Sequence, residues 1–100
     1  IILDNLISNS KKNGAHSVGV YFQKDGGKLV VDFSDDGDGV NMDIYTPETI
    51  FAVGVTNKRG GSGIGLHTIR YTMENKLSGS ISFLGNGVNK YKGATFRLTM

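Results

Sequence analysis

At the centre of the sequence stands Gly60-Gly61-Ser62-Gly63-Ile64-Gly65-Leu66, a glycine-rich run that opens directly into an apolar repeat of helical spacing. The repeat is formed by Leu66, Ile69, Met73 and Leu77. Bare backbone N–H groups at the start of a helix attract anions, because the unpaired amides and the helix dipole both favour negative charge there. The run therefore predicts a phosphate site, although such a loop taken alone is equally compatible with a flexible surface loop.

Length and composition describe one globular domain of 100 residues, with no apolar run long enough to span a membrane and no signal-peptide pattern. The absence of cysteine excludes disulfides and thiol chemistry and fits a cytoplasmic protein. A net charge of +2 gives no support for nucleic-acid binding. Because the chain opens with apolar Ile1-Ile2-Leu3 and no initiator Met, we expect a piece of a longer polypeptide, whose parent could be membrane-anchored.

Hydrophobic periodicity predicts two helices and two hairpins, separated by a long loop over residues 40–62 that is typical of a cover over a site. The short loop helix would be capped by Thr46, with Pro47 in its first position. This order favours an α+β two-layer sandwich with a largely antiparallel sheet, and not a parallel βαβ fold. The expected helices cover residues 1–13 and 65–76, and the expected strands cover residues 17–23, 29–33, 80–84 and 94–99.

Three polar residues share one stripe of the first helix: Asn5, Asn9 and Lys12. An amide oxygen is a suitable ligand for Mg²⁺, and a lysine in the same row can neutralise phosphate. The stripe is also compatible with an ordinary solvated helix face.

An acidic, glycine-containing segment, Asp35-Asp36-Gly37-Asp38-Gly39, follows the second strand. A buried carboxylate there could accept a hydrogen bond from an exocyclic amine, and the glycines would let a flat ring lie against the backbone. An EF-hand is excluded, because a strand precedes the segment and its twelfth position is Thr46 instead of Glu. A simple hairpin turn remains the alternative.

The glycine-rich run fits neither of the common nucleotide-binding loops. A P-loop requires Lys and Ser or Thr after its last glycine, whereas Leu66 follows Gly65. A dinucleotide fingerprint has wider glycine spacing and directly follows a strand. Neither exclusion removes phosphate binding by the backbone, for which Lys58 and Arg59 lie upstream as cations.

Taken in order, these motifs resemble the GHKL superfamily of histidine kinases, DNA gyrase B subunits, heat-shock chaperone ATPases and MutL. The resemblance is strongest to the catalytic, ATP-binding domain of sensor histidine kinases. Residues 4–10 resemble its N box, residues 50–58 its F box and the following Thr-Thr-Lys segment, and residues 93–96 its closing strand. The resemblance implies a Bergerat fold that lacks the strand and helix preceding the N box, and a single domain over residues 1–100.

The resemblance also implies ATP and Mg²⁺ as ligands and a role for each motif residue. Asn9 takes the place of the Mg²⁺ ligand, Asn5 the place that orders metal or phosphate, and Asp35 the place that reads adenine. Lys12 and Lys58 take phosphate-contacting places, with Lys58 reaching the γ-phosphate. The remaining implied contacts are Gly37 and Gly39 beside the ring, and Gly61, Ser62, Gly63, Ile64, Gly65 and Leu66 around the phosphates. Thr95 is also implied near the adenine, but it follows Ala94 and so alternates to the other face of the strand.

The implied reaction is phosphoryl transfer, because Asn5 stands where the ATPase branches carry a general-base Glu. His16 and His67 do not fit the acceptor role, so the acceptor would lie on a dimerisation segment outside this chain and would pass phosphate to a response regulator. The isolated domain would be monomeric and its parent a homodimer. Two alternatives stay open: an ATPase driving conformational change, and a degenerate non-catalytic signalling module, which the extra carboxylates Asp36 and Asp38 would favour.

Overall fold

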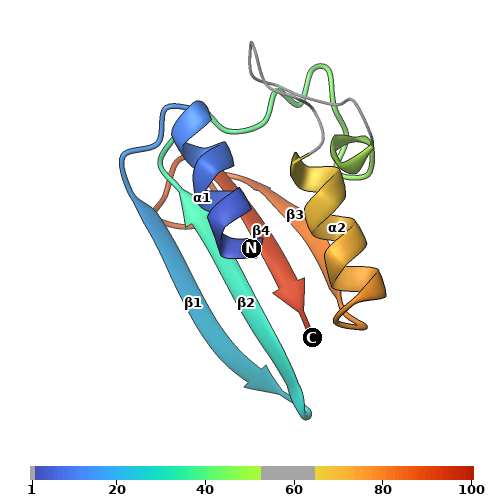
Figure 1. Cartoon of the computed structure of the whole chain (residues 1–100). Coiled ribbons are helices and arrows are strands. Elements are labelled where there is room, and N and C mark those ends of the chain that lie inside the picture. Colours follow the sequence, from blue (N-terminus) through green and yellow to red (C-terminus); the bar gives the residue numbers. More distant parts are fainter. Residues whose placement is uncertain (1, 53–64) are drawn as a thin grey trace.

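The computed structural model describes residues 2–52 and 65–100, and the elements in these ranges follow the predicted order (Figure 1). The two longer helices lie where the periodicity placed them. The elements are α1 (Ile2–Lys12), β1 (Val18–Asp25), β2 (Lys28–Asp35), the 3₁₀ helix η1 (Thr49–Phe51), α2 (Gly65–Asn75), β3 (Ser80–Asn86) and β4 (Ala94–Thr99).

The four strands form one sheet in the order β1-β2-β4-β3, and each of the three pairings is antiparallel. Both longer helices cover the same face of this sheet (Figure 1). The predicted two-layer α+β sandwich is therefore confirmed. Because β2 pairs with both β1 and β4, it occupies an interior position in the sheet, and its last residue, Asp35, contacts the last turn of α1.

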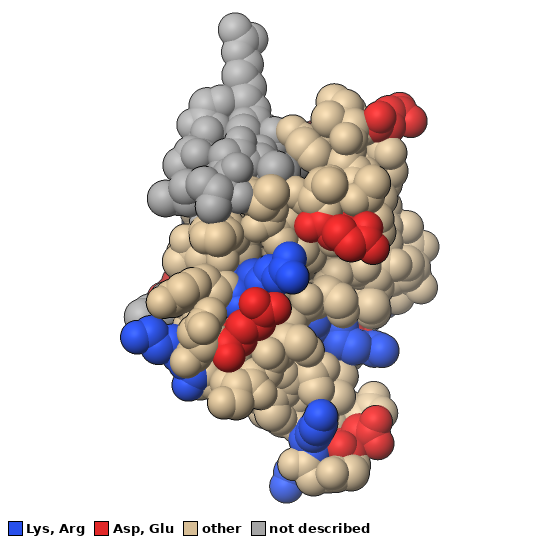
Figure 2. Space-filling model, turned by 90° about the vertical axis from the view of Figure 1, so that its right-hand side faces the viewer, with Lys and Arg blue, Asp and Glu red and all other residues tan. Residues whose placement is uncertain are grey.

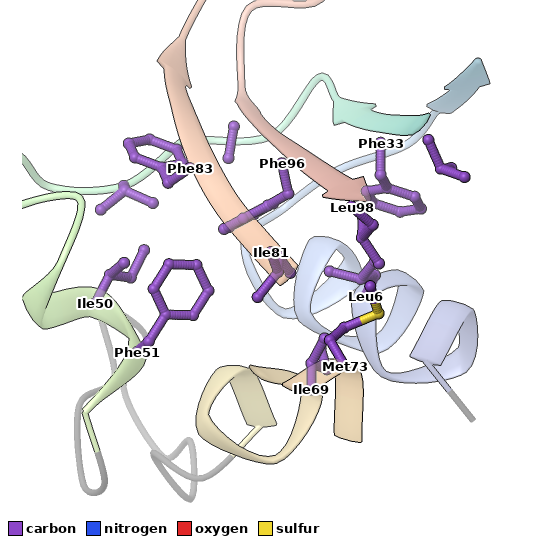
Figure 3. Close-up of a cluster of buried hydrophobic side chains, with 13 residues drawn as sticks. Leu6, Phe33, Ile50, Phe51, Ile69, Met73, Ile81, Phe83, Phe96 and Leu98 are labelled. Carbon is purple, nitrogen blue, oxygen red and sulfur yellow. The ribbon is translucent and has the colours of Figure 1, made fainter. Parts of the chain in front are cut away.

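The hydrophobic core lies between the sheet and the two helices (Figure 3). Phe96 is the aromatic centre, with its ring centroid 5.3 Å from that of Phe83 and 6.2 Å from that of Phe51. Phe51 brings η1 into the core and so anchors the end of the loop that follows β2. The other fully or largely buried side chains include Leu6, Phe33, Ile50, Ile69, Met73, Ile81 and Leu98.

The predicted apolar faces are buried only where the two layers overlap. On α1, Leu6 is buried, whereas Leu3 and Ile7 remain 42% and 40% exposed. The β1–β2 register puts Phe22 on the same face as Val31, yet Phe22 is 65% exposed. Strand β1 lies at an edge of the sheet, and the helix layer does not extend over its far half (Figure 1).

The short loop helix begins later than predicted. It starts at Thr49, with Glu48 in the cap position and no side-chain cap bond. Thr46 instead forms a reciprocal pair one turn earlier: its Oγ1 accepts from the Thr49 N–H at 3.1 Å, and Thr49 Oγ1 accepts from the Thr46 N–H at 2.8 Å. This pair closes a turn around Pro47, and the Ile50 N–H donates to the Thr46 carbonyl at 3.2 Å, so the turn leads directly into the 3₁₀ helix.

Two tight chain reversals have the backbone geometry that their residues indicate. Gly26 and Gly27, at φ 57° and 84°, connect the paired residues Asp25 and Lys28 as a two-residue hairpin turn. After α2, Ser78 has φ 51° and the Gly79 N–H donates to the Met73 carbonyl at 2.7 Å. This is a helix C-terminal motif whose left-handed position normally favours glycine.

Ser78→Gly should stabilise the domain by about 0.5–1 kcal/mol, because it relieves the left-handed strain on a side chain and outweighs the added freedom of the unfolded chain. Denaturant unfolding measures this change. The matched control Ser80→Gly, in strand β3, should be destabilising by a similar amount. Equal destabilisation by both substitutions would contradict this account of the helix end.

Candidate functional site

The carboxyl end of β2 carries a buried carboxylate. Asp35 is only 3% exposed, and each of its carboxylate oxygens accepts one hydrogen bond. Ser10 Oγ, from the last turn of α1, donates to Oδ2 at 2.7 Å, and the Gly37 N–H donates to Oδ1 at 3.0 Å. These hydrogen bonds offset the free-energy cost of burying a carboxylate, which would be strongly destabilising without partners.

Two glycines allow the backbone to pack against this carboxylate. A Cβ on Gly93 would overlap Asp35 Oδ1 and lie 2.7 Å from the Asp35 carbonyl oxygen. The Gly93 N–H donates to that carbonyl at 2.9 Å. A Cβ on Gly37 would lie 2.7 Å from the Asn13 carbonyl oxygen. The glycine at position 37 thus serves close backbone packing with the end of α1.

Asn9 connects α1 to the start of α2. Its side chain is half-buried, and a Cβ on Gly65 would lie 3.0 Å from Asn9 Oδ1 and 3.2 Å from Nδ2. Gly65 is the first residue of α2, so the Asn9 amide lies beside the N-terminus of that helix. Because Ser10 follows Asn9 directly, one turn of α1 contacts both Asp35 and the start of α2.

The other predicted residues of the α1 stripe flank this point. Asn5 is half-buried one turn before Asn9, and Lys12 is exposed at the last position of the helix. Leu66 is half-buried and packs against the edge of the core. The structure therefore brings Asn9, Asp35, Gly37 and Gly65 together around the carboxyl end of α1, with Asn5 and Lys12 on either side.

The loop after Asp35 is fixed by a residue that sequence reasoning missed. Asn86 Nδ2 donates to the Val40 carbonyl at 2.7 Å, and its Oδ1 accepts from the Val40 N–H at 3.0 Å. Gly39, at φ 77°, lies so close that a Cβ would be 2.7 Å from Asn86 Oδ1. No local pattern in the sequence indicates a long-range pairing of this kind for Asn86.

The two extra carboxylates do not converge on Asp35. Asp36 Oδ1 accepts from the backbone N–H groups of Ser17 at 2.9 Å and His16 at 2.8 Å. These bonds, Ser17 first, hold the pKa of Asp36 below its usual value. Asp38 is exposed, with its carboxylate beside Gly14. Asp36 thus secures the connection between α1 and β1.

Thr95 lies apart from the other candidate residues. Its hydroxyl and that of Ser34 are 2.8 Å apart, and Asn89 Nδ2 donates to Ser34 Oγ at 2.8 Å. Ser34 pairs with Thr95 across β2 and β4, on the face of the sheet opposite to Asp35. We therefore leave Thr95 out of the site, because strand alternation turns its side chain away from the carboxylate.

Part of the predicted site lies outside the described residues: Lys58, Gly61, Ser62, Gly63 and Ile64.

Away from the Asp35 carboxylate, the described residues form a hollow of about 330 Å³ between η1 and α2. There the Arg70 guanidinium lies 5.7 Å from the Phe51 ring centroid and pairs with Glu74. The face in Figure 2 carries interspersed basic and acidic side chains, with no continuous stripe of either sign. In residues 2–52 and 65–100, no helix is long and apolar enough to cross a membrane.

The comparison with protein families decides the assignment. A family model described as "Histidine kinase-, DNA gyrase B-, and HSP90-like ATPase" matches residues 1–100. The chain belongs to this family. The GHKL resemblance drawn from the motifs is thereby confirmed, and the domain is of the ATP-binding kinase and ATPase type.

Solved structures show the same fold for this GHKL domain. Among 45 matching chains is the mycobacterial sensor histidine kinase MprB, which superposes with a TM-score of 0.78 at 21% identity. The match covers 99% of this chain and 66% of that one, so the GHKL domain described here spans somewhat less than two thirds of the MprB chain. No curated protein sequence matches.

Gly93→Ala should destabilise the domain by about 3 kcal/mol or more, because the new methyl group would overlap the buried Asp35 carboxylate. Gly87→Ala is the matched control: Gly87 also lies in a loop and has φ 63°, but its Cβ would have room. Backbone strain alone should cost it about 1 kcal/mol. Similar losses in denaturant unfolding would show that the Asp35 contact does not constrain position 93.

Asp36→Asn should lower stability at pH 7 and have little effect in acid. A carboxyl group with a lowered native pKa stabilises the fold above its unfolded pKa of about 3.9. This contribution is lost as the pH falls through the lower native value. Urea unfolding of both proteins from pH 7 to pH 2 measures the difference, and a difference that grows in acid would contradict the role of Asp36.

Proposed function

We propose that this domain binds ATP with Mg²⁺ and is the catalytic domain of a sensor histidine kinase. The observation that carries the proposal is the position of one turn of α1: Asn9 lies beside the N-terminus of α2, and the next residue, Ser10, bonds Asp35. The amide proposed as metal ligand and the buried carboxylate therefore lie on the same side of the molecule, as one nucleotide would require.

Each end of the site has chemistry suited to one part of ATP. Asp35 would accept a hydrogen bond from the 6-amino group of adenine, with the Gly37 and Gly39 segment alongside the ring. The Asn9 amide oxygen is a fitting ligand for Mg²⁺, which keeps several waters and binds nucleotide phosphates. The N-terminus of α2 would favour the phosphates, with Gly61, Ser62, Gly63 and Ile64 leading into it.

Charge neutralisation and positioning would carry the transfer step, since phosphoryl transfer needs little covalent participation by the protein. Lys12 at the end of α1 and Lys58 upstream of the glycine run are the cations proposed for this role. Asn5 would help order metal or phosphate one turn before Asn9. An amide at position 5 is a poor general base, which favours transfer to a protein group over hydrolysis by water.

The proposed acceptor is a histidine of a separate dimerisation segment in the parent protein. The bond between the γ-phosphorus and the bridging oxygen would break as an imidazole nitrogen bonds to phosphorus, releasing ADP. The phosphoryl group would then pass to an aspartate of a response regulator. We assign the acceptor role neither to His16, whose backbone N–H donates to Asp36, nor to His67 in α2. The kinase domain would lie in the cytoplasm, and the parent protein would be a homodimer.

Calorimetric titration of the full chain with ATP, with and without Mg²⁺, tests the binding proposal. We expect saturable binding that strengthens when Mg²⁺ is present. A folded sample that binds no ATP would overturn the nucleotide site altogether. If ATP binds, steady release of phosphate by the isolated domain would support the ATPase alternative instead of transfer to a missing histidine.

Asn9→Ala should abolish most of the Mg²⁺ dependence of ATP affinity, because it removes the proposed metal ligand. The matched control Asn75→Ala removes an amide at the other end of α2, where its Nδ2 donates to the Tyr71 carbonyl at 3.0 Å. Asn75→Ala should leave the dependence intact. An unchanged Mg²⁺ dependence in Asn9→Ala would show that the metal is held elsewhere.

A further inference from the structure

Ser10 is a buried polar residue that the motif interpretation did not use. It is 4% exposed on the last turn of α1, and its hydroxyl donates to Asp35 Oδ2 at 2.7 Å across 25 residues of sequence. No carboxylate oxygen can donate in return, so the direction of this hydrogen bond is fixed for ionised Asp35. The contact joins the helix that carries Asn9 to the residue proposed to read the base.

Two donors from different elements restrict rotation of the Asp35 carboxylate. The final torsion of an aspartate is otherwise broad, so a free carboxylate can turn to suit its partner. Here Ser10 on α1 holds Oδ2, while the Gly37 N–H in the loop holds Oδ1. The Gly93 backbone also packs directly against Oδ1. The plane of the carboxylate is therefore fixed, and the group cannot rotate to turn both oxygens toward one ligand.

The orientation of a carboxylate decides which purine it suits. Adenine offers a single exocyclic amino group beside an acceptor nitrogen, which matches one carboxylate oxygen. Guanine offers adjacent N1–H and N2–H donors, which suit both oxygens together, and places an acceptor oxygen at C6. A carboxylate that could rotate would accommodate the two-donor edge of guanine, whereas a fixed one would not.

We propose that Ser10 is a positioning residue that determines purine specificity, by fixing Asp35 so that it offers one acceptor to a 6-amino group. This inference rests on the proposed function, because it concerns how the same nucleotide site distinguishes adenine from guanine. It assigns Ser10 no contact with the nucleotide. Its effect should therefore depend entirely on the presence of the Asp35 carboxylate.

Titration of the full chain with ATP and with GTP, each with Mg²⁺, tests the inference. Ser10→Ala should reduce the ratio of ATP to GTP affinity by about ten-fold, the effect of losing one hydrogen bond to a charged group. Ser82→Ala, which removes an exposed hydroxyl on β3, is the control and should leave the ratio unchanged. Without nucleotide, Ser10→Ala should also melt several degrees lower than Ser82→Ala.

A double-mutant cycle separates positioning from a general structural effect. In an Asp35→Asn background, adding Ser10→Ala should cause no further change in the affinity ratio. An unchanged ratio in Ser10→Ala, or an equal effect of Ser10→Ala with and without the Asp35 carboxylate, would overturn the inference. Should Ser10→Ala fail to fold, Ser10→Cys, with a weaker donor, should lower the ratio and is judged by the same criterion.

Failure of the inference is distinguishable from failure of the proposed function. Wild-type protein that binds neither nucleotide would overturn both. Wild-type protein that binds ATP with a normal Mg²⁺ dependence, together with an unchanged ratio in Ser10→Ala, would overturn the specificity role alone.

Discussion

Burial of the Asp35 carboxylate constrains the elements around it. A carboxylate that is almost fully removed from water must be hydrogen-bonded, and here the donors come from α1 and from the loop after β2. The same contact requires a glycine at position 93, where the chain enters β4. One buried charge thereby fixes the end of a helix, a loop and the approach to a strand relative to one another.

This constraint links the two ends of the candidate site. Ser10 bonds the carboxylate, and Asn9 before it lies beside the first residue of α2, so the two contacts share one helical turn. The distance between the groups proposed to read the base and to bind the metal is therefore set by the backbone of α1, which packs on the core through Leu6. A rigid spacing of this kind suits the proposed function, in which the domain acts mainly by holding a nucleotide in place.

Much of the fold could be predicted from local patterns, since alternation, helical spacing and the Gly26-Gly27 turn are properties of short segments. Burial could not, because the exposure of Phe22 depends on β1 being an edge strand. For the site, Asn9 and Asp35 were predicted from motif order, and the structure places Asn9 next to Ser10, the residue that bonds Asp35. The roles of Asp36 and Asn86 were missed, because a polar side chain does not reveal which distant backbone groups it will contact.

Amide NMR of the isotopically labelled chain, titrated with ATP and Mg²⁺, tests most directly whether these groups share one ligand. The account predicts that the Asn9 side-chain amide and the backbone amides of Gly37 and Gly65 shift together along one saturation curve, with a single dissociation constant. Shifts at Gly37 without shifts at Asn9 and Gly65, or shifts that saturate at separate concentrations, would contradict the account.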